Sequence, residues 1–308
     1  MKDYEQLSKE VVSYAGGLPL ALTVLVSSLC DKNIHHWKSA LARLKVIPDN
    51  EILVKLKISF DGLTEVQKDL FLDIACFFRW KKKDRAMEIL DACGFHPVIG
   101  VEELRQKALI TISNGRFDMH DLVQEMARYI VRGEHPRNPE KHSRVWKKED
   151  VPTICAMDAT TELDKIEAIQ VKYSQVHEEP PPSLIVANMR NLRYIQWEGD
   201  PKNPSASPLV NNSPPIGLCC LILSRGSEDK LWNGNKVLRN LKIMDNLRHI
   251  HLDNIGDTQV KKPGELWFFR SDLRKLDLNR CDLGDEDVSS AVWVLLNLEE
   301  LNLSHNKF

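Results

Sequence analysis

The sequence lacks any hydrophobic run long enough to cross a bilayer. Its longest apolar stretch, Leu18 to Leu29, is broken by Ser27 and Ser28, whereas a membrane-spanning helix needs about 20 apolar residues. The first residues, Met1 to Gln6, are polar and do not resemble a secretory signal. We therefore expect an intracellular protein with no membrane span, located in the cytoplasm or alternatively in the nucleus.

An excess of charge of one sign is also lacking. The chain carries 42 Lys and Arg against 44 Asp and Glu, which gives a formal net charge of −2 over 308 residues. A protein that binds nucleic acid through bulk electrostatics should carry a basic excess. With 43% hydrophobic and 28% charged residues, the composition is typical of a globular protein, and the length suggests two domains.

The residue patterns of common enzyme and metal sites are missing too. The seven cysteines include no C-x-x-C pair, which favours reduced thiols over disulfides or a zinc site. No H-E-x-x-H, G-x-S-x-G or G-x-G-x-x-G pattern occurs. His249 and His251 share one strand face, but a metal needs a third ligand. We expect neither enzyme activity nor a bound metal.

What is present begins with a helical subdomain over residues 1–46. Apolar residues at helical spacing mark three segments: Leu7, Val11 and Val12; Leu20 to Leu29; and Ile34, Trp37, Leu41 and Leu44. Gly16 and Gly17 should end the first helix, and Pro19 stands where the second should begin. The sequence therefore predicts a helix-to-helix joint at Gly16 to Pro19.

Residues 47–135 predict a winged-helix subdomain. Helices are expected over 52–60, from Thr64 with Gln67 as a reciprocal capping box, over 84–93, over 101–108 and from Asp121 as N-cap. The helix after Thr64 should bury Val66, Leu70, Phe71, Ile74, Phe77 and Phe78, and the last helix Leu122, Val123, Met126 and Ile130. Two short alternating runs flank Ser113 to Arg116, which contains the Asn-Gly pair typical of a β-hairpin. Helices followed by a hairpin and a closing helix make up the winged-helix plan.

Because many winged helices bind DNA, a DNA-binding regulator is a competing hypothesis. Residues 47–135 contain 13 Lys and Arg against 15 Asp and Glu, and Glu102 and Glu103 stand where phosphate contacts would be needed. The basic run Lys81 to Lys83 is more typical of a solvated loop. We therefore expect no DNA partner.

Residues 136–185 predict a connector, with a stiff spacer at Pro180 to Pro182 and a domain boundary near residue 183. The chain then repeats. The pattern L-x-x-L-x-L-x-x-N/C-x-L is complete from Leu273 to Leu283 and closes on Phe308 in the copy that starts at Leu298, with weaker copies from Leu192, Leu218 and Leu247. The starts are 26, 29, 26 and 25 residues apart, the period of a leucine-rich repeat. Residues 186–308 therefore predict an α/β solenoid.

In such a repeat the leucines point into the core, and Asn306 or Cys281 should hydrogen-bond the turn backbone. Side chains between the leucines should face a concave, partner-binding surface: Tyr194, Gln196, Glu198, Cys220, Ile222, Ser224, His249, His251, Asp253, Lys275, Asp277, Asn279, Glu300, Asn302 and Ser304. The chain stops at Phe308 on a repeat position without a polar cap, so the fold is expected to be a multidomain α+β protein truncated at its C-terminus.

Four motifs precede the leucine repeats, in this order: Gly16-Gly-Leu-Pro-Leu-Ala-Leu22, Ser59-Phe-Asp-Gly-Leu63, Phe71-Leu-Asp-Ile-Ala-Cys-Phe-Phe78 and Met119-His-Asp-Leu122. Together they resemble the plant nucleotide-binding leucine-rich-repeat immune receptors, in the subfamily that carries an N-terminal TIR domain. The resemblance spans nearly the whole chain.

The resemblance implies a switch that holds ADP and exchanges it for ATP when the repeats sense a ligand. It implies that Pro19 packs against the adenine and ribose, that His120 hydrogen-bonds the β-phosphate, and that Asp121 places His120. The family's G-x-x-x-x-G-K-[ST] loop, acidic strand and TIR domain are not in this sequence. Since each missing charge-assisted bond contributes roughly 1.5–3 kcal/mol, we expect weak or undetectable ADP binding and no ATP hydrolysis.

The function that follows is a fragment of a plant immune receptor acting in pathogen recognition and defence signalling. Its expected partners are proteins: a pathogen effector, a guarded host protein or a full-length receptor. A scaffold or decoy that does not itself signal is an alternative, beside the DNA-binding regulator.

Overall fold

The computed structural model describes residues 2–44, 49–133, 135–157, 161–172, 188–199, 217–225, 246–253, 272–281, 283–285 and 296–308. The expected spacer at Pro180 to Pro182 lies outside these ranges. The chain forms two compact units. The first comprises Met1–Leu90 and Phe95–Gly133, and the second comprises Asp91–Gly94 and Glu134–Phe308.

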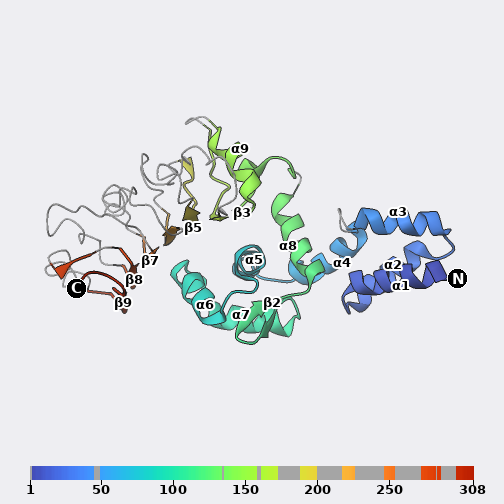
Figure 1. The fold of residues 1–308 in the computed structure, drawn as a ribbon, viewed down its shortest axis with the longest axis horizontal. Coiled ribbons are helices and arrows are strands. Elements are labelled where there is room, and N and C mark those ends of the chain that lie inside the picture. Colours follow the sequence, from blue (N-terminus) through green and yellow to red (C-terminus); the bar gives the residue numbers. More distant parts are fainter. Residues whose placement is uncertain are drawn as a thin grey trace. The chain divides into compact units, whose positions relative to one another are not determined.

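The first unit begins with three helices, α1 (Lys2–Ala15), α2 (Pro19–Leu29) and α3 (Ile34–Leu44). They lie side by side at the blue end of the ribbon in Figure 1. Their shared core includes Leu7, Val11, Leu25 and Leu41. The three predicted helical segments are confirmed, because burying one apolar stripe from each helix forms a common core.

Helices α4 (Asn50–Asp61) and α5 (Glu65–Asp73) follow. The capping box is confirmed, since the Thr64 hydroxyl accepts from the Gln67 N–H and the Gln67 side chain accepts from the Thr64 N–H. Beyond α5 the chain widens into a π-helix, Ile74–Phe78, all of whose residues are buried. One prediction is wrong: Val66 is 56% exposed. The first turn of α5 makes polar contacts instead, with Gln67 donating to the Glu103 carboxylate.

The wing is a hairpin of β1 (Thr111–Ser113) and β2 (Arg116–Asp118). Asn114 and Gly115 both have positive φ, 51° and 69°, as a two-residue hairpin turn that matches the strand twist requires. The predicted hairpin is therefore confirmed.

The basic run before the wing is not a free loop. Phe117 accepts from the Trp80 N–H at 2.7 Å and donates to the Lys81 carbonyl at 3.1 Å. The backbone of residues 80–83 therefore lies along β2. Helix α6 (Lys83–Ala92) starts at the end of this run, and α7 begins at Pro97 rather than at residue 101 and ends at Gln106. Its earlier start follows from Pro97, whose fixed φ suits a first helical position.

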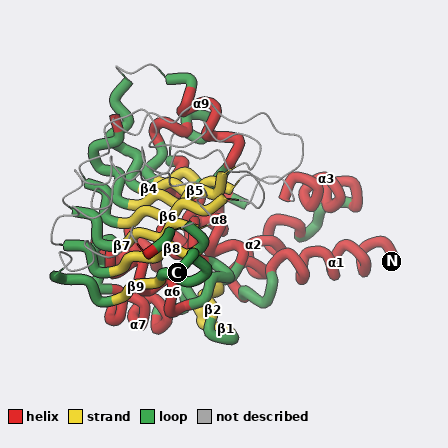
Figure 2. The backbone as a smooth tube through the Cα atoms, turned by 60° about the vertical axis from the view of Figure 1, so that its left-hand side comes forward, coloured by secondary structure: helices red, strands yellow, loops and turns green. Residues whose placement is uncertain are grey.

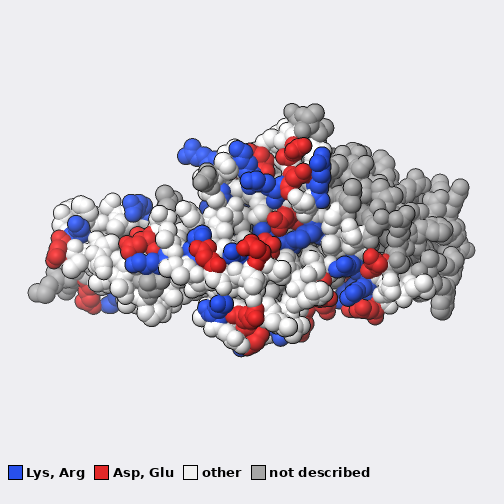
Figure 3. Space-filling model, turned by 180° about the vertical axis from the view of Figure 1, so that it is seen from behind, with Lys and Arg blue, Asp and Glu red and all other residues white. Residues whose placement is uncertain are grey.

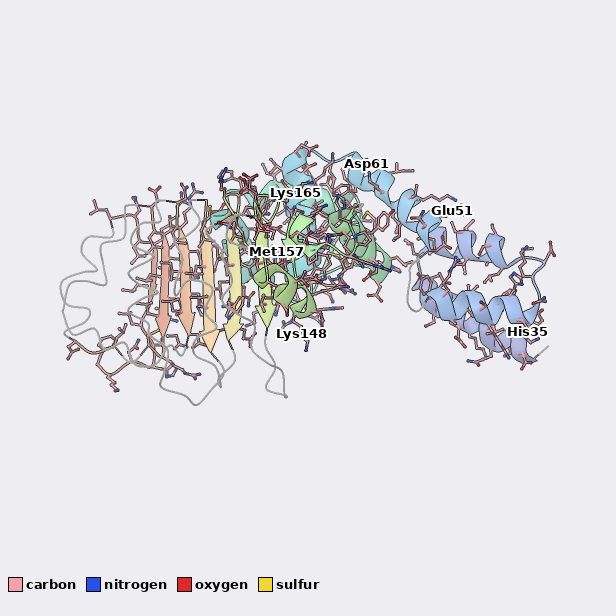
Figure 4. All side chains as sticks on the ribbon, turned by 90° about the horizontal axis from the view of Figure 1, so that it is seen from above. His35, Glu51, Asp61, Lys148, Met157 and Lys165 are labelled. Atoms are coloured by element: carbon pink, nitrogen blue, oxygen red, sulfur yellow. The ribbon has the colours of Figure 1, made fainter. Side chains whose placement is uncertain are left out.

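The described residues of the second unit include a parallel sheet of seven strands in sequence order: β3 (Arg144–Val145), β4 (Ala168–Lys172), β5 (Tyr194–Gly199), β6 (Cys220–Arg225), β7 (His249–Asp253), β8 (Lys275–Asn279) and β9 (Glu300–Asn302). Figure 2 shows the strands stacked one after another, and in Figure 4 their arrows point the same way. Rows of apolar side chains run across the strands in register, such as Ile195, Leu221, Ile250 and Leu276. These rows form the core of the unit.

The expected connector over 136–185 is more structured than the sequence predicts. It contains β3, β4 and helix α9 (Val151–Cys155), with short 3₁₀ turns at Pro139–Lys141 and Lys148–Asp150. Ile166, Ile169 and Val171 are buried and follow the same L-x-x-L-x-L spacing as the later strands. Because Ile and Val replace the leucines, the leucine pattern did not reveal this strand.

The expected turn contacts are confirmed at β8 and β9. The Asn306 side-chain N–H groups donate to the carbonyls of Leu278 and Leu303, both at 2.8 Å. Its carbonyl oxygen accepts from the backbone N–H groups of Cys281 at 2.9 Å and Leu283 at 3.1 Å. One amide side chain thus satisfies four backbone groups where the chain leaves the sheet.

Candidate functional site

The joint between α1 and α2 is built from two glycines with positive φ, 55° at Gly16 and 85° at Gly17. This backbone conformation strains residues that carry a Cβ. The Leu18 N–H donates to the Ala15 carbonyl at 2.8 Å, closing the turn. Pro19 occupies the first turn of α2 and is exposed. The predicted joint is confirmed, with Pro19 open to solvent.

His120 caps helix α8 (Asp121–Arg132). Its backbone is extended, with φ −61° and ψ 142°, and its Nδ1 accepts from the Leu122 N–H at 3.1 Å. The prediction of Asp121 as N-cap is therefore wrong: Asp121 is the first helical residue. An imidazole nitrogen one position earlier reaches the free N–H groups of the first turn, which need an acceptor.

The other ring nitrogen of His120 reaches the joint. Nε2 lies 3.0 Å from the Ala15 carbonyl oxygen and 3.2 Å from that of Gly16. Since both partners can only accept, Nε2 carries the hydrogen, and since Leu122 donates, Nδ1 does not. The ring is therefore held as the neutral Nε2–H tautomer. Its N–H points at carbonyls at the C-terminal end of α1, where the helix dipole favours a donor.

Glycine is required at position 16 for a second reason. A Cβ added there would lie 2.6 Å from His120 Nε2, whereas a Cβ at Gly17 would meet nothing within 4 Å. The His120 ring thus lies directly against the backbone of the joint. The structure brings His120 to Ala15 and Gly16, three to four residues before Pro19.

A residue that the sequence analysis missed supports this arrangement. Arg79 follows the π-helix and is 14% exposed. Its guanidinium contacts Asp118 and Asp121, which flank Met119 and His120, and also Gln124. The acidic partners lie 39 and 42 positions away in the sequence, so no local spacing rule could have found them.

The second predicted site lies on the sheet, where a polar row crosses β7, β8 and β9. His251 Nδ1 lies 2.6 Å from an Asp277 carboxylate oxygen, and the Asn302 side chain donates to the other oxygen at 3.0 Å. Beside this row, Lys275 pairs with Glu300 at 2.6 Å. Toward the other edge of the sheet, Gln196 accepts from Gln170 at 2.6 Å and from the Tyr194 hydroxyl at 2.8 Å. The candidate side chains therefore form separate bonded groups, one on β4 and β5 and the others on β7 to β9, because the buried Ile222 lies in register between Gln196 and His251.

Asp277 is the centre of the group on β7 to β9. Burial raises the pKa of its carboxyl, but hydrogen bonds from His251, Asn302 and the Asn279 N–H outweigh burial, so that the pKa lies below its ordinary value. The carboxylate is therefore stabilised in its charged form. These hydrogen bonds also fix the directions of the His251 side chain on β7 and of the Asn302 side chain on β9.

Four of the expected surface residues are not at the surface: Tyr194, Cys220, Ile222 and His249. Tyr194 is 1% exposed and His249 is 4% exposed. They belong to the first row across the sheet, in which Ala168 and Cys220 are also buried. Ile222, in the next row, is 2% exposed. The expectation of solvent exposure is therefore wrong for these positions, because alternation predicts on which face of a strand a residue lies but not what covers that face.

The described residues show neither a membrane-spanning helix nor a metal-binding cluster. No helix among them is both long and apolar enough to cross a membrane. The same residues contain no cluster of three or more His, Cys, Asp or Glu side chains arranged to hold a metal ion.

Comparison with known proteins agrees with the geometry of the first unit. Residues 64–135 match the family model of the Roq1-like disease resistance protein winged-helix domain. This match includes Arg79, the wing and His120. The chain is similar to plant disease resistance proteins. Its relatives include disease resistance protein RUN1 of Vitis rotundifolia, 37% identical over 76% of this chain and 17% of the relative.

Two further relatives match different shares of the chain. TMV resistance protein N of Nicotiana glutinosa is 38% identical over 68% of this chain and 18% of its own length. Disease resistance protein RPP2A of Arabidopsis thaliana is 33% identical over 96% of this chain and 23% of its own length. The chain therefore spans about a fifth of the length of the curated relatives that it matches.

Proposed function

We propose that this chain is part of an intracellular plant immune receptor that acts in pathogen recognition and defence signalling. The observation that carries the proposal is the contact of the His120 ring with the Gly16 backbone. It joins two motifs 104 residues apart at one place, inside the region similar to disease resistance proteins. The match of residues 64–135 to the Roq1-like winged-helix model supports the same reading.

In this proposal the joint and His120 contact ADP. The residues present fit ADP in part. His120 has an N–H that can donate to a phosphate oxygen, and the exposed ring of Pro19 can pack against an apolar face of the ligand. His120 Nε2–H now donates to backbone carbonyls, so an anion would have to compete with them. With one side-chain donor among these residues, affinity for ADP should be weak.

The sheet is proposed to be the start of a leucine-rich-repeat solenoid. The in-register apolar rows, the parallel order and the Asn306 turn contacts support this interpretation. Its partner would be a protein that contacts the polar side chains of this sheet: Gln196, His251, Lys275, Asp277, Glu300 and Asn302. The proposed organisation is a helical subdomain over 1–46, a winged helix over 47–135, a connector over 136–185 whose strands β3 and β4 join the sheet, and repeats over 186–308.

The competing DNA-binding function has less support. On the face shown in Figure 3, Lys and Arg are interspersed with Asp and Glu among the described residues. Glu51 and Asp61, labelled near the two ends of α4 in Figure 4, pair with Lys55 and Lys57. Nucleic-acid binding relies on an uncompensated basic stripe. We propose a protein-binding, non-enzymatic role instead.

Calorimetric titration of ADP with Mg²⁺ into the full chain tests the nucleotide role. We expect weak binding that His120→Ala lowers by about tenfold or more, the value of one charge-assisted hydrogen bond. His35→Ala is the matched control, because His35 is exposed on α3 (Figure 4) and should leave the affinity unchanged. Equal affinity of wild type and His120→Ala would remove His120 from the site, and no heat with folded wild type would contradict ADP binding by this chain.

A further inference from the structure

Arg79 is the residue through which the π-helix reaches the loop that carries His120. Its Nε lies 3.2 Å from an Asp118 carboxylate oxygen and its Nη2 lies 2.7 Å from an Asp121 oxygen. Its Nη1 donates to the Gln124 side-chain carbonyl at 2.7 Å. All three guanidinium nitrogens are therefore used, each on a different residue.

These partners lie on both sides of His120. Asp118 ends β2 and also accepts from the Met119 N–H at 2.7 Å. Asp121 and Gln124 lie in the first turns of α8, and Gln124 in turn donates to the Ala75 carbonyl of the π-helix at 2.8 Å. The two residues between β2 and α8, Met119 and His120, are thus anchored at both ends on one cation.

The chemistry of the anchor is specific to arginine. Its planar guanidinium presents donors in fixed directions, whereas a lysine ammonium is a single point of charge. The guanidinium also stands over the Trp80 ring, with Cζ 4.9 Å from the ring centroid, a stacking contact that lysine makes less well. A lysine at this position could keep one carboxylate but could not hold Asp118, Asp121 and Gln124 together.

We propose that Arg79 is the positioning residue for His120. By binding side chains that precede and follow Met119 and His120, Arg79 holds the imidazole as the Nε2–H tautomer against the carbonyls of Ala15 and Gly16. The Arg79 guanidinium contacts Asp118, Asp121, Gln124 and Trp80, and it acts on the joint through His120. The inference deepens the proposed nucleotide role of His120, but the placement of the ring can be measured without ADP.

Histidine ¹⁵N NMR of the full chain tests the placement. In the wild type, the His120 signals, assigned by their loss in His120→Gln, should show a hydrogen on Nε2 and none on Nδ1. In Arg79→Gln the two tautomers should average, and exchange of the Nε2 hydrogen with water should rise by roughly tenfold or more, as expected when charge-assisted bonds that order a donor are lost. Arg79→Lys should lie between the two.

Arg105→Gln is the matched control, because Arg105 pairs with Glu102 on the exposed surface of α7 and its loss should leave the His120 signals unchanged. If Arg79→Gln does not fold, Asp121→Asn gives the test, since this carboxylate is 83% exposed and Arg79 keeps its ion pair with Asp118. It should shift the His120 signals in the same direction by a smaller amount. Unchanged His120 signals in a folded Arg79→Gln or in Asp121→Asn would overturn the inference.

The two proposals fail in different ways. If ADP does not bind the wild type but Arg79→Gln still frees the His120 ring, the nucleotide role is wrong and the positioning role stands. If His120→Ala weakens ADP binding while Arg79→Gln changes neither the His120 signals nor ADP affinity, the nucleotide role stands and the positioning role is wrong.

Discussion

The two units of the chain are stabilised by different kinds of contact. In the second unit each strand pairs in register with the next, and the core positions are buried in every strand from β4 to β8. In the first unit, single side chains join segments far apart in the sequence, as Arg79 does with Asp118 and His120 with Ala15. In the sheet, rows of buried side chains share the free energy of folding. In the first unit, individual side-chain contacts such as these two contribute it.

This difference teaches where a substitution should matter. A buried residue in a row of the sheet contacts equivalent residues on both sides, and its loss should be felt by adjacent strands. Gly16 does not belong to such a row, so its loss should act on one joint. The predictions below test that contrast, from the largest expected effect to the smallest.

Ile250→Ala should have the largest effect. Ile250 is 0% exposed in the middle of the sheet, paired in register with Leu221 and Leu276. Removing its side chain leaves a cavity that costs about 2–5 kcal/mol. Amide hydrogen exchange should report the loss across β6, β7 and β8 together. Leu296→Ala, at a residue 85% exposed, should change little, and a loss confined to β7 would contradict the shared row.

Gly16→Ala should destabilise the first unit by about 2–4 kcal/mol. The added methyl group combines the cost of positive φ with a clash against His120. Gly17→Ala keeps the φ cost alone and should lose about 1–2 kcal/mol. Thermal unfolding of both variants measures the difference. Equal losses would mean that the His120 ring does not lie against Gly16.

Thr64→Ala should cost about 1 kcal/mol, because it removes the hydroxyl that accepts from the Gln67 N–H. Thr64→Ser keeps that hydroxyl and should retain nearly all of the stability. Hydrogen exchange in the first turn of α5 should rise in Thr64→Ala and should leave the strands of the second unit unchanged. A change in those strands would argue against separate units.

Asp277→Asn should show a small, pH-dependent loss of stability. Since the folded-state pKa of Asp277 lies below its ordinary value, the carboxylate stabilises the fold above about pH 4, and this contribution is lost as the pH falls through the folded-state pKa. The wild type should therefore exceed Asp277→Asn by about 1 kcal/mol at neutral pH, with the difference vanishing at strongly acidic pH. A constant difference over the acid range in urea unfolding would exclude this cause. Asp285→Asn, at an exposed residue, is the control.

Much of the fold follows from the sequence because periodic burial is a local signal. The joint at Gly16 to Pro19, the Thr64 capping box and the Asn114-Gly115 turn each need only a few neighbouring residues, and each is confirmed. The strands from β5 to β9 follow from leucine spacing. Strand β4 was missed because Ile169 and Val171 satisfy the core without the leucines of the pattern.

The candidate site was only partly predictable. Sequence resemblance pointed to His120, but the role of its Nδ1 as the cap of α8 depends on side-chain direction, which spacing does not contain. Arg79 could not be found because its partners become neighbours only after β2 and α8 pack beside the π-helix. The burial of Tyr194 and His249 depends likewise on what covers the sheet, not on the strand itself.

The most direct test of the central claim is a double-mutant cycle between Gly16→Ala and His120→Ala, measured as free energies of unfolding of the full chain. If the ring lies against the joint as described, removing it relieves part of the clash, and the two losses should fall short of additivity by about 1–2 kcal/mol, within the range for residues in contact. Additive losses would contradict the account, because residues that do not touch have independent effects.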